Sequence, residues 1–181
     1  AFTPCISMYT MTTDDVVEFL KFMTSTDYKY KTWRENVGLS GEALKLDYVE
    51  LGNEVDIHLL NKIDGKTLEE EVETPEQRIE WYMSRAKAYE QAIHNYDPNI
   101  KVIACGPTGA WGNIEQSELW MQKLGETFGN SLYGVAYHPY YYGHKPAFII
   151  DQLPAQLKSS YDNAAGTDIK IVATEHARAW G

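Results

Sequence analysis

Short apolar runs and amphipathic segments alternate along the 181 residues of this chain, and this alternation constrains its fold more than any other feature. Apolar runs typical of buried strands cover residues 4–9, 48–51, 100–104, 132–137 and 169–174. Segments with helical spacing begin near residue 13 and cover about 74–96, 114–128 and 147–163. Because parallel neighbours need long crossovers, this order predicts an α/β fold with about five parallel strands and four crossover helices.

Local signals sharpen some of these boundaries. Thr74, Pro75 and Gln77 form a capping box with proline in the first helical position, so they mark the start of the helix 74–96. Pro154 should split or kink the helical segment 147–163. The polar segment 25–46 has no predicted element, and 55–73 is predicted to be a loop.

Two parallel architectures fit this order: part of a (β/α) barrel or an open doubly wound sheet. Nucleotide-binding sheets of the second type carry a glycine-rich phosphate loop after the first strand, and none is found here. The Gly-Pro-Thr-Gly segment at 106–109 is too short for a P-loop and lacks its lysine. Five strands and four helices are too few for a closed eight-stranded barrel, which typically needs about 250 residues.

Composition excludes several classes of partner. The formal charge is −10 and no basic cluster is present, so nucleic acid is not an expected partner. No apolar stretch is long enough to span a membrane, so the chain is not expected to be membrane-embedded, and a cytoplasmic or secreted location stays open. Cys5 and Cys105 have no metal-ligand spacing and are predicted to be small core residues. No metal and no cofactor are expected.

Two glutamates, Glu54 and Glu175, each follow directly on a predicted strand. The carboxyl ends of parallel strands meet at one rim, where the catalytic residues of (β/α) barrels lie. Retaining glycosidases use one carboxylic acid to protonate the leaving oxygen and one carboxylate to attack the anomeric carbon. The pair therefore predicts a barrel glycosidase whose two carboxyl groups lie roughly 5 Å apart.

Three motifs occur in the order found in clan A glycoside hydrolases. The segment 48–54 resembles the acid/base motif of that clan, and His138-Pro139-Tyr140 and Thr174-Glu175 follow it. The closest resemblance is to family 51 α-L-arabinofuranosidases, with family 39 β-xylosidases next. It covers nearly the whole chain and corresponds to strands 3 to 7 of the family's barrel. The resemblance implies a partial TIM (β/α)8 barrel, with residues 1–181 forming a single incomplete catalytic domain.

The resemblance also implies a role for individual residues. Glu54 would be the acid/base, Glu175 the nucleophile, and Asn53 a hydrogen-bond partner of the sugar 2-hydroxyl. The first glutamate must then be protonated and the second charged. Family 51 commonly has an aromatic residue after the nucleophile, whereas His176 stands here, so the sugar specificity stays open.

Further residues are expected around the sugar. The resemblance implies that His138 and Tyr140 border the pocket and that Tyr140 donates a hydrogen bond to the nucleophile. Trp111 and Trp180 follow predicted strands and are candidate platforms for sugar rings. The histidines near the glutamates match no metal-binding spacing.

The leading functional hypothesis is a retaining α-L-arabinofuranosidase acting on an oligosaccharide or a plant-type polysaccharide. A β-xylosidase or β-glucanase of the same clan is an alternative, and so is a non-catalytic carbohydrate-binding or assembly fragment. A barrel with strands 3 to 7 alone leaves two unpaired edges. We therefore expect self-association, or the remaining strands of a longer parent chain, to cover them, and little activity in an isolated monomer.

Overall fold

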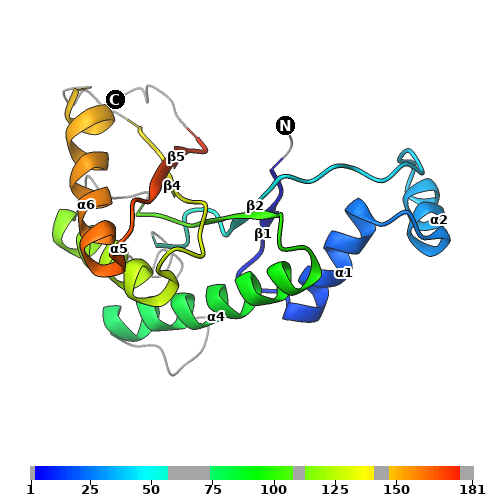
Figure 1. Cartoon of the computed structure of the whole chain (residues 1–181), viewed down its shortest axis with the longest axis horizontal. Helices are drawn as coiled ribbons and strands as arrows, with labels where there is room; N and C mark the ends of the chain where they lie inside the picture. The colour runs from blue at the N-terminus through cyan, green and yellow to red at the C-terminus, as the bar shows by residue number, and fades with distance from the viewer. Residues whose placement is uncertain (1–2, 57–73, 108–112, 141–146, 176–181) are drawn as a thin grey trace.

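A computed structural model describes residues 3–56, 74–107, 113–140 and 147–175, and they form one five-stranded sheet (Figure 1). Its strands are β1 (Cys5–Ile6), β2 (Tyr48–Leu51), β3 (Lys101–Ala104), β4 (Gly134–Tyr137) and β5 (Lys170–Ala173). Every neighbouring pair is parallel. The predicted parallel sheet is confirmed, although four of the five strands are shorter than the apolar runs that predicted them.

The strand order distinguishes the two parallel architectures. Consecutive strands are neighbours throughout, in the order β1-β2-β3-β4-β5, whereas a doubly wound sheet reverses its order at a switch point. The sheet is also strongly curved. Thr174, just after β5, donates a hydrogen bond of 3.1 Å to Glu50 in β2, although β3 and β4 lie between. In a flat sheet these strands would be roughly 14 Å apart. The sheet is therefore an arc of a barrel.

The helices follow the strands as the pattern predicts. They are α1 (Thr13–Thr24), α4 (Pro75–Tyr96), α5 (Ile114–Phe128) and α6 (Leu153–Ala165), with a π-helical turn η1 (Phe148–Gln152) before the last. The capping box of α4 is present: the Thr74 hydroxyl accepts from the Gln77 amide, and the Gln77 side chain accepts from the Thr74 amide. The π-helical turn gives way to α6 next to Pro154, which confirms the predicted split.

The polar segment 25–46 contains a helix that was not predicted. Helix α2 (Tyr28–Asn36) forms in the polar segment 25–46 and lies at one end of the molecule, away from the sheet (Figure 1). Its Arg34 is buried and donates hydrogen bonds to the carbonyl oxygens of Phe22, Ser25 and Gly41. These contacts tie α2 to the end of α1 and to the segment that leads into β2. Tertiary hydrogen bonds therefore hold this helix in place, together with the buried Tyr30 and the contact between Trp33 and Phe22.

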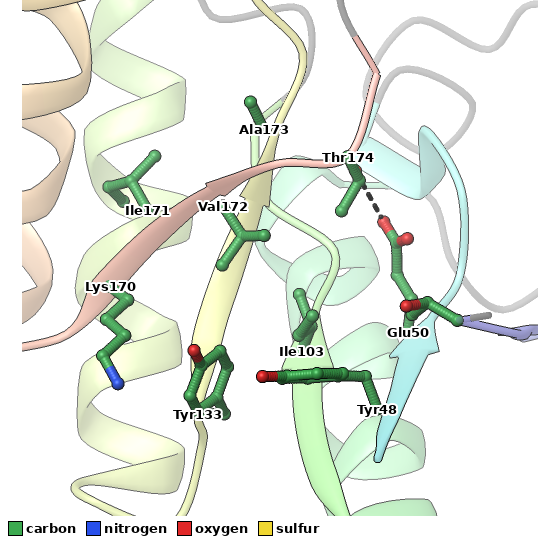
Figure 2. A pocket seen from close by; sticks show the side chains of 10 residues that line it. Tyr48, Glu50, Ile103, Tyr133, Lys170, Ile171, Val172, Ala173 and Thr174 are labelled. Carbon is green, nitrogen blue, oxygen red and sulfur yellow. Dashed lines mark hydrogen bonds between the residues drawn. The ribbon is translucent and has the colours of Figure 1, made fainter. Parts of the chain in front are cut away.

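The two faces of the sheet have different roles. Val49, Leu51 and Val102 are fully buried and belong to the core that the sheet shares with the helices. The alternate residues Glu50 and Ile103 line a cavity of about 680 Å³ on the concave face, together with residues of β5 (Figure 2). The apolar core thus lies outside the arc, and the cavity lies inside it.

Edge position explains one wrong prediction. Cys105 is buried as predicted, whereas Cys5 is exposed. It lies in the edge strand β1, in register with Glu50 of β2, where a neighbour covers only one side. Among the described residues, no helix is both long and apolar enough to cross a membrane.

Candidate active site

The turn after β2 carries the first candidate carboxylate. Gly52 has a φ of 86°, and a Cβ at this position would lie 2.4 Å from a Val55 methyl carbon and 2.6 Å from Met8 Cγ. Glycine is therefore required here. Glu54 itself has a φ of 50°, which is unusual for a residue with a side chain. This tight turn places Glu54 at the rim of the sheet, next to the exposed Asn53.

A tyrosine of α4 fixes the base of this turn. The Tyr82 hydroxyl donates to the carbonyl oxygen of Leu51 at 2.9 Å and accepts from the amide of Cys105 at 2.7 Å. Its ring packs against Trp120 of α5, with centroids 4.8 Å apart. The carboxyl ends of β2 and β3 are thus held together through one buried side chain.

The structure brings Glu54 and Glu175 together at the carboxyl ends of β2 and β5. A carboxylate oxygen from each glutamate and a ring nitrogen of His138 all lie within 4.8 Å of one another. His138 Nδ1 lies 3.2 Å from Glu54 Oε1 and 3.9 Å from Glu175 Oε2. The Tyr140 hydroxyl donates to Glu175 Oε2 at 3.1 Å. These distances agree with the separation of roughly 5 Å predicted for the carboxyl groups.

Burial differs within this group. The side chains of Glu54 and Glu175 are 33% and 43% exposed, so both carboxylates are accessible to a ligand. His138 is only 1% exposed and follows β4 directly. The imidazole is therefore a fixed element between two accessible carboxylates.

A second row of hydrogen bonds lies beneath the pair. His138 Nε2 lies 3.1 Å from the Thr174 hydroxyl oxygen, and that hydroxyl donates to Glu50 Oε1 at 3.1 Å (Figure 2). Glu50 is 8% exposed, and its burial raises the pKa of its carboxyl above the ordinary value, while the hydrogen bond from Thr174 acts in the opposite direction. Sequence reasoning did not select Thr174 or Glu50. The signal was a lone carboxylate inside the otherwise apolar run 48–51.

Only some of the remaining predicted site residues belong to the part of the chain that the structure describes. Asn53 is exposed beside Glu54, and its contact with a sugar hydroxyl stays a prediction. Trp111, Trp180 and His176 lie outside the described residues. The roles of the two tryptophans as ring platforms stay predictions, and so does the effect of His176 on sugar specificity.

The donor atoms of Glu54, His138 and Glu175 form a group that is also compatible with a divalent metal ion. Within the part of the chain that the structure describes, this is the one such group. However, Glu54 is already hydrogen-bonded to His138, and Glu175 to Tyr140. The expectation that no metal is needed stays a prediction.

Comparison with known proteins gives matches in structure but not in sequence. No family model matches the chain, and no curated protein matches it. A family 51 α-L-arabinofuranosidase from Bifidobacterium longum is similar over 96% of this chain and 35% of its own, with a TM-score of 0.74 and 16% identity. The arabinose complex of an α-L-arabinofuranosidase from Thermotoga maritima covers 95% of this chain and 33% of its own, with a TM-score of 0.66 and 20% identity.

A family 51 arabinofuranosidase from Xanthomonas axonopodis pv. citri gives a similar match, with a TM-score of 0.69 and 12% identity over 97% of this chain and 36% of its own. The chain therefore spans about a third of the length of the structures it resembles. At these identities the likeness concerns the fold. It confirms that the chain has part of the barrel fold of family 51 enzymes, as the motifs predicted.

Proposed function

We propose that residues 1–181 form the catalytic part of a retaining glycoside hydrolase that releases terminal α-L-arabinofuranosyl groups. The observation that carries this proposal is the position of Glu54 and Glu175 at the carboxyl ends of two strands, where one carboxylate oxygen of each lies within 4.8 Å of the other. Inverting enzymes need about 6.5–9.5 Å between their carboxyl groups to admit a water molecule. A separation this short supports direct attack by one carboxylate.

In the first step, a Glu175 oxygen forms a bond to the anomeric carbon as the glycosidic bond breaks. The Glu54 proton moves to the leaving oxygen at the same time. The Tyr140 hydroxyl supports this role because its hydrogen bond to Glu175 Oε2 favours the ionised carboxylate and orients it. Glu54 is well placed to donate because both carboxylates lie close to His138 Nδ1, at 3.2 Å for Glu54 and 3.9 Å for Glu175.

In the second step, Glu54 acts as a base. It takes a proton from a water molecule, the water oxygen bonds to the anomeric carbon, and the bond to Glu175 breaks. Asn53, exposed beside Glu54, would hold the 2-hydroxyl of the sugar in both steps. Trp111 and Trp180 are proposed as ring platforms. No cofactor takes part in this scheme.

The choice of sugar rests on the structural neighbours. Two of them are described as family 51 arabinofuranosidases, and a third is an α-L-arabinofuranosidase in complex with arabinose. An arabinofuranosyl group at the end of an oligosaccharide or plant polysaccharide is therefore the proposed substrate. Because the chain spans about a third of those proteins, the proposed activity is that of the barrel completed by further strands.

The test is a set of aryl glycosides assayed with wild type and three variants. Glu175→Ala should abolish turnover of the aryl α-L-arabinofuranoside. Glu54→Ala should lose on the order of 10²–10⁴-fold with a poor leaving group but retain activity with a good one, which needs little protonation. Glu42→Ala removes an exposed carboxylate remote from the site and is the matched control. The proposal is wrong if both site variants keep wild-type rates with the poor leaving group, and the sugar is wrong if a β-xyloside is preferred.

A further inference from the structure

Glu50 is a buried carboxylate that the reaction scheme above does not use. It lies in the middle of β2, is 8% exposed, and faces the concave side of the sheet rather than the solvent (Figure 2). Removing a carboxylate from water costs free energy unless polar partners compensate for the lost hydration. Glu50 accepts a hydrogen bond from the Thr174 hydroxyl, which also contacts His138. Glu50 is thus linked to the candidate site.

The direction of these hydrogen bonds follows from the donor capacity of each group. An ionised carboxylate only accepts, so the Thr174 hydroxyl hydrogen points at Glu50. The Thr174 oxygen then accepts from His138, and Nε2 must carry a hydrogen. A neutral imidazole with its hydrogen on Nε2 has a bare Nδ1. For this neutral imidazole, the hydrogen between Nδ1 and Glu54 Oε1, which lie 3.2 Å apart, comes from the carboxyl group of Glu54.

We propose that Glu50 is a positioning residue: through Thr174 and His138, it keeps the proton of the candidate acid on Glu54. The role of Glu50 in catalysis rests on the proposed function, whereas the predicted position of the proton on Glu54 does not. The network makes the two exposed carboxylates unequal. Glu54 faces a nitrogen that accepts a proton, and Glu175 faces the Tyr140 hydroxyl, which donates one. A retaining mechanism needs one protonated and one ionised carboxyl group, and this arrangement supplies the difference.

The same groups can also form the hydrogen bonds in the opposite direction, and a variant at position 50 can test which direction is present. If the group at position 50 donated to Thr174, the Thr174 hydroxyl would turn toward Nε2 and the imidazole hydrogen would move to Nδ1. That hydrogen would then be donated to an ionised Glu54. A glutamine at position 50 has the shape of glutamate but carries no charge, and its amide can donate as well as accept. Once position 50 is neutral, the charge-assisted hydrogen bond from Nδ1–H to an ionised Glu54 favours the reversed row. Glu50→Gln should therefore reverse the row of hydrogen bonds without removing volume.

Within the described part of the chain, the polar groups that contact this row can be named. His138 is surrounded by Glu54, Glu175 and Tyr140 on the rim side and by Thr174 below. Glu50 has Thr174 above it and Cys5 beside it on β1. Partial burial, followed by the nearby Glu50, raises the pKa of Cys5 to about 11, so this residue is an uncharged thiol at neutral pH. Glu50 is thus the carboxylate in contact with the Nε2 side of this row, so the effect of Glu50→Gln can be assigned to it.

The experiment is nitrogen NMR of the full chain labelled with ¹⁵N-histidine, in which each ring nitrogen reports whether it carries hydrogen. Wild type should show His138 with hydrogen on Nε2 and a bare Nδ1, and Glu50→Gln should show the reverse. Thr174→Val, which removes the hydroxyl, should also lose the wild-type pattern, whereas Thr174→Ser should keep it. Glu42→Gln is the control for charge alone, and His138→Gln assigns the signals.

Two results would overturn the inference. One is a His138 that carries hydrogen on Nδ1 in wild type, whether neutral or doubly protonated. The other is a wild-type pattern that persists in Glu50→Gln. If the barrel completed by further strands has no glycosidase activity but the proton position switches as described, the proposed function fails and the role of Glu50 stands.

Kinetics supply the second readout. In Glu50→Gln, the high-pH limb of kcat/KM with a poor leaving group should move to lower pH. A shift of about one pH unit would reduce the protonated fraction of the acid about tenfold above that limb. Rates with a good leaving group should change little. Equal losses with both leaving groups would indicate a general structural defect and contradict a positioning role.

Discussion

Replacing Tyr82 with phenylalanine tests how strongly the rim of the sheet depends on one hydroxyl group. The ring can keep its contact with Trp120, because only one atom is removed. Two backbone groups lose their partner: the carbonyl oxygen of Leu51 and the amide of Cys105. Both residues are fully buried, so water does not replace the hydroxyl. The change therefore isolates hydrogen bonding from packing.

The magnitude follows from these two bonds. A hydrogen bond contributes about 0.5–1.5 kcal/mol net, and a buried group left without a partner costs about 1–3 kcal/mol. For two bonds we expect Tyr82→Phe to lower the free energy of unfolding by about 2–3 kcal/mol. The loss should also affect the turn 52–54, because Leu51 directly precedes it. Activity with a poor leaving group should fall for this reason.

Urea unfolding followed by circular dichroism measures the difference in free energy. The matched control is Tyr9→Phe, because the buried Tyr9 hydroxyl has no hydrogen-bond partner among residues 3–56, 74–107, 113–140 and 147–175. This control should cost nothing or raise stability, since it removes a buried polar atom without breaking a bond. A loss below about 0.5 kcal/mol for Tyr82→Phe would refute the reasoning, as would equal losses in the two variants.

Two further predictions concern Glu50 and the concave face of the sheet beside β5. The pKa of Glu50 is raised in the folded state, so its contribution to stability is greatest at low pH and is lost as pH rises through that pKa. Glu50→Gln should therefore be more stable than wild type at neutral pH, and the gap should narrow on acidification; a gap that widens would contradict this. The cavity beside β5 and the half-exposed Ile171 and Val172 leave apolar surface uncovered, so light scattering should show self-association. A monodisperse monomer that unfolds cooperatively and is fully active would contradict the partial-barrel interpretation.

The features that local chemistry determines could be predicted from the sequence. The capping box at Thr74 and the proline after it marked the start of α4, and Pro154 marked the transition from η1 to α6. The strand-end positions of Glu54 and Glu175 placed both carboxylates at one rim, because parallel strands end on the same side. These inferences need only spacing and the direction of the chain.

The features that tertiary contacts determine were missed. Helix α2 has no apolar stripe, and its position depends on Arg34 reaching three carbonyl oxygens that no local pattern encodes. The exposure of Cys5 depends on β1 being an edge strand. The contact between Glu50 and Thr174 joins residues 124 positions apart and exists only because the sheet is curved.

The left-handed backbone at Glu54 has a consequence for engineering. A residue with a side chain in this conformation costs about 1–2 kcal/mol relative to the ordinary right-handed region, whereas glycine and asparagine adopt it more easily. A chain selected only for thermal tolerance would therefore tend to replace Glu54, the group on which the proposed chemistry depends. Screens for heat-resistant variants should hold this position constant and look for improvement elsewhere, for example among the exposed apolar residues of the segment 28–44.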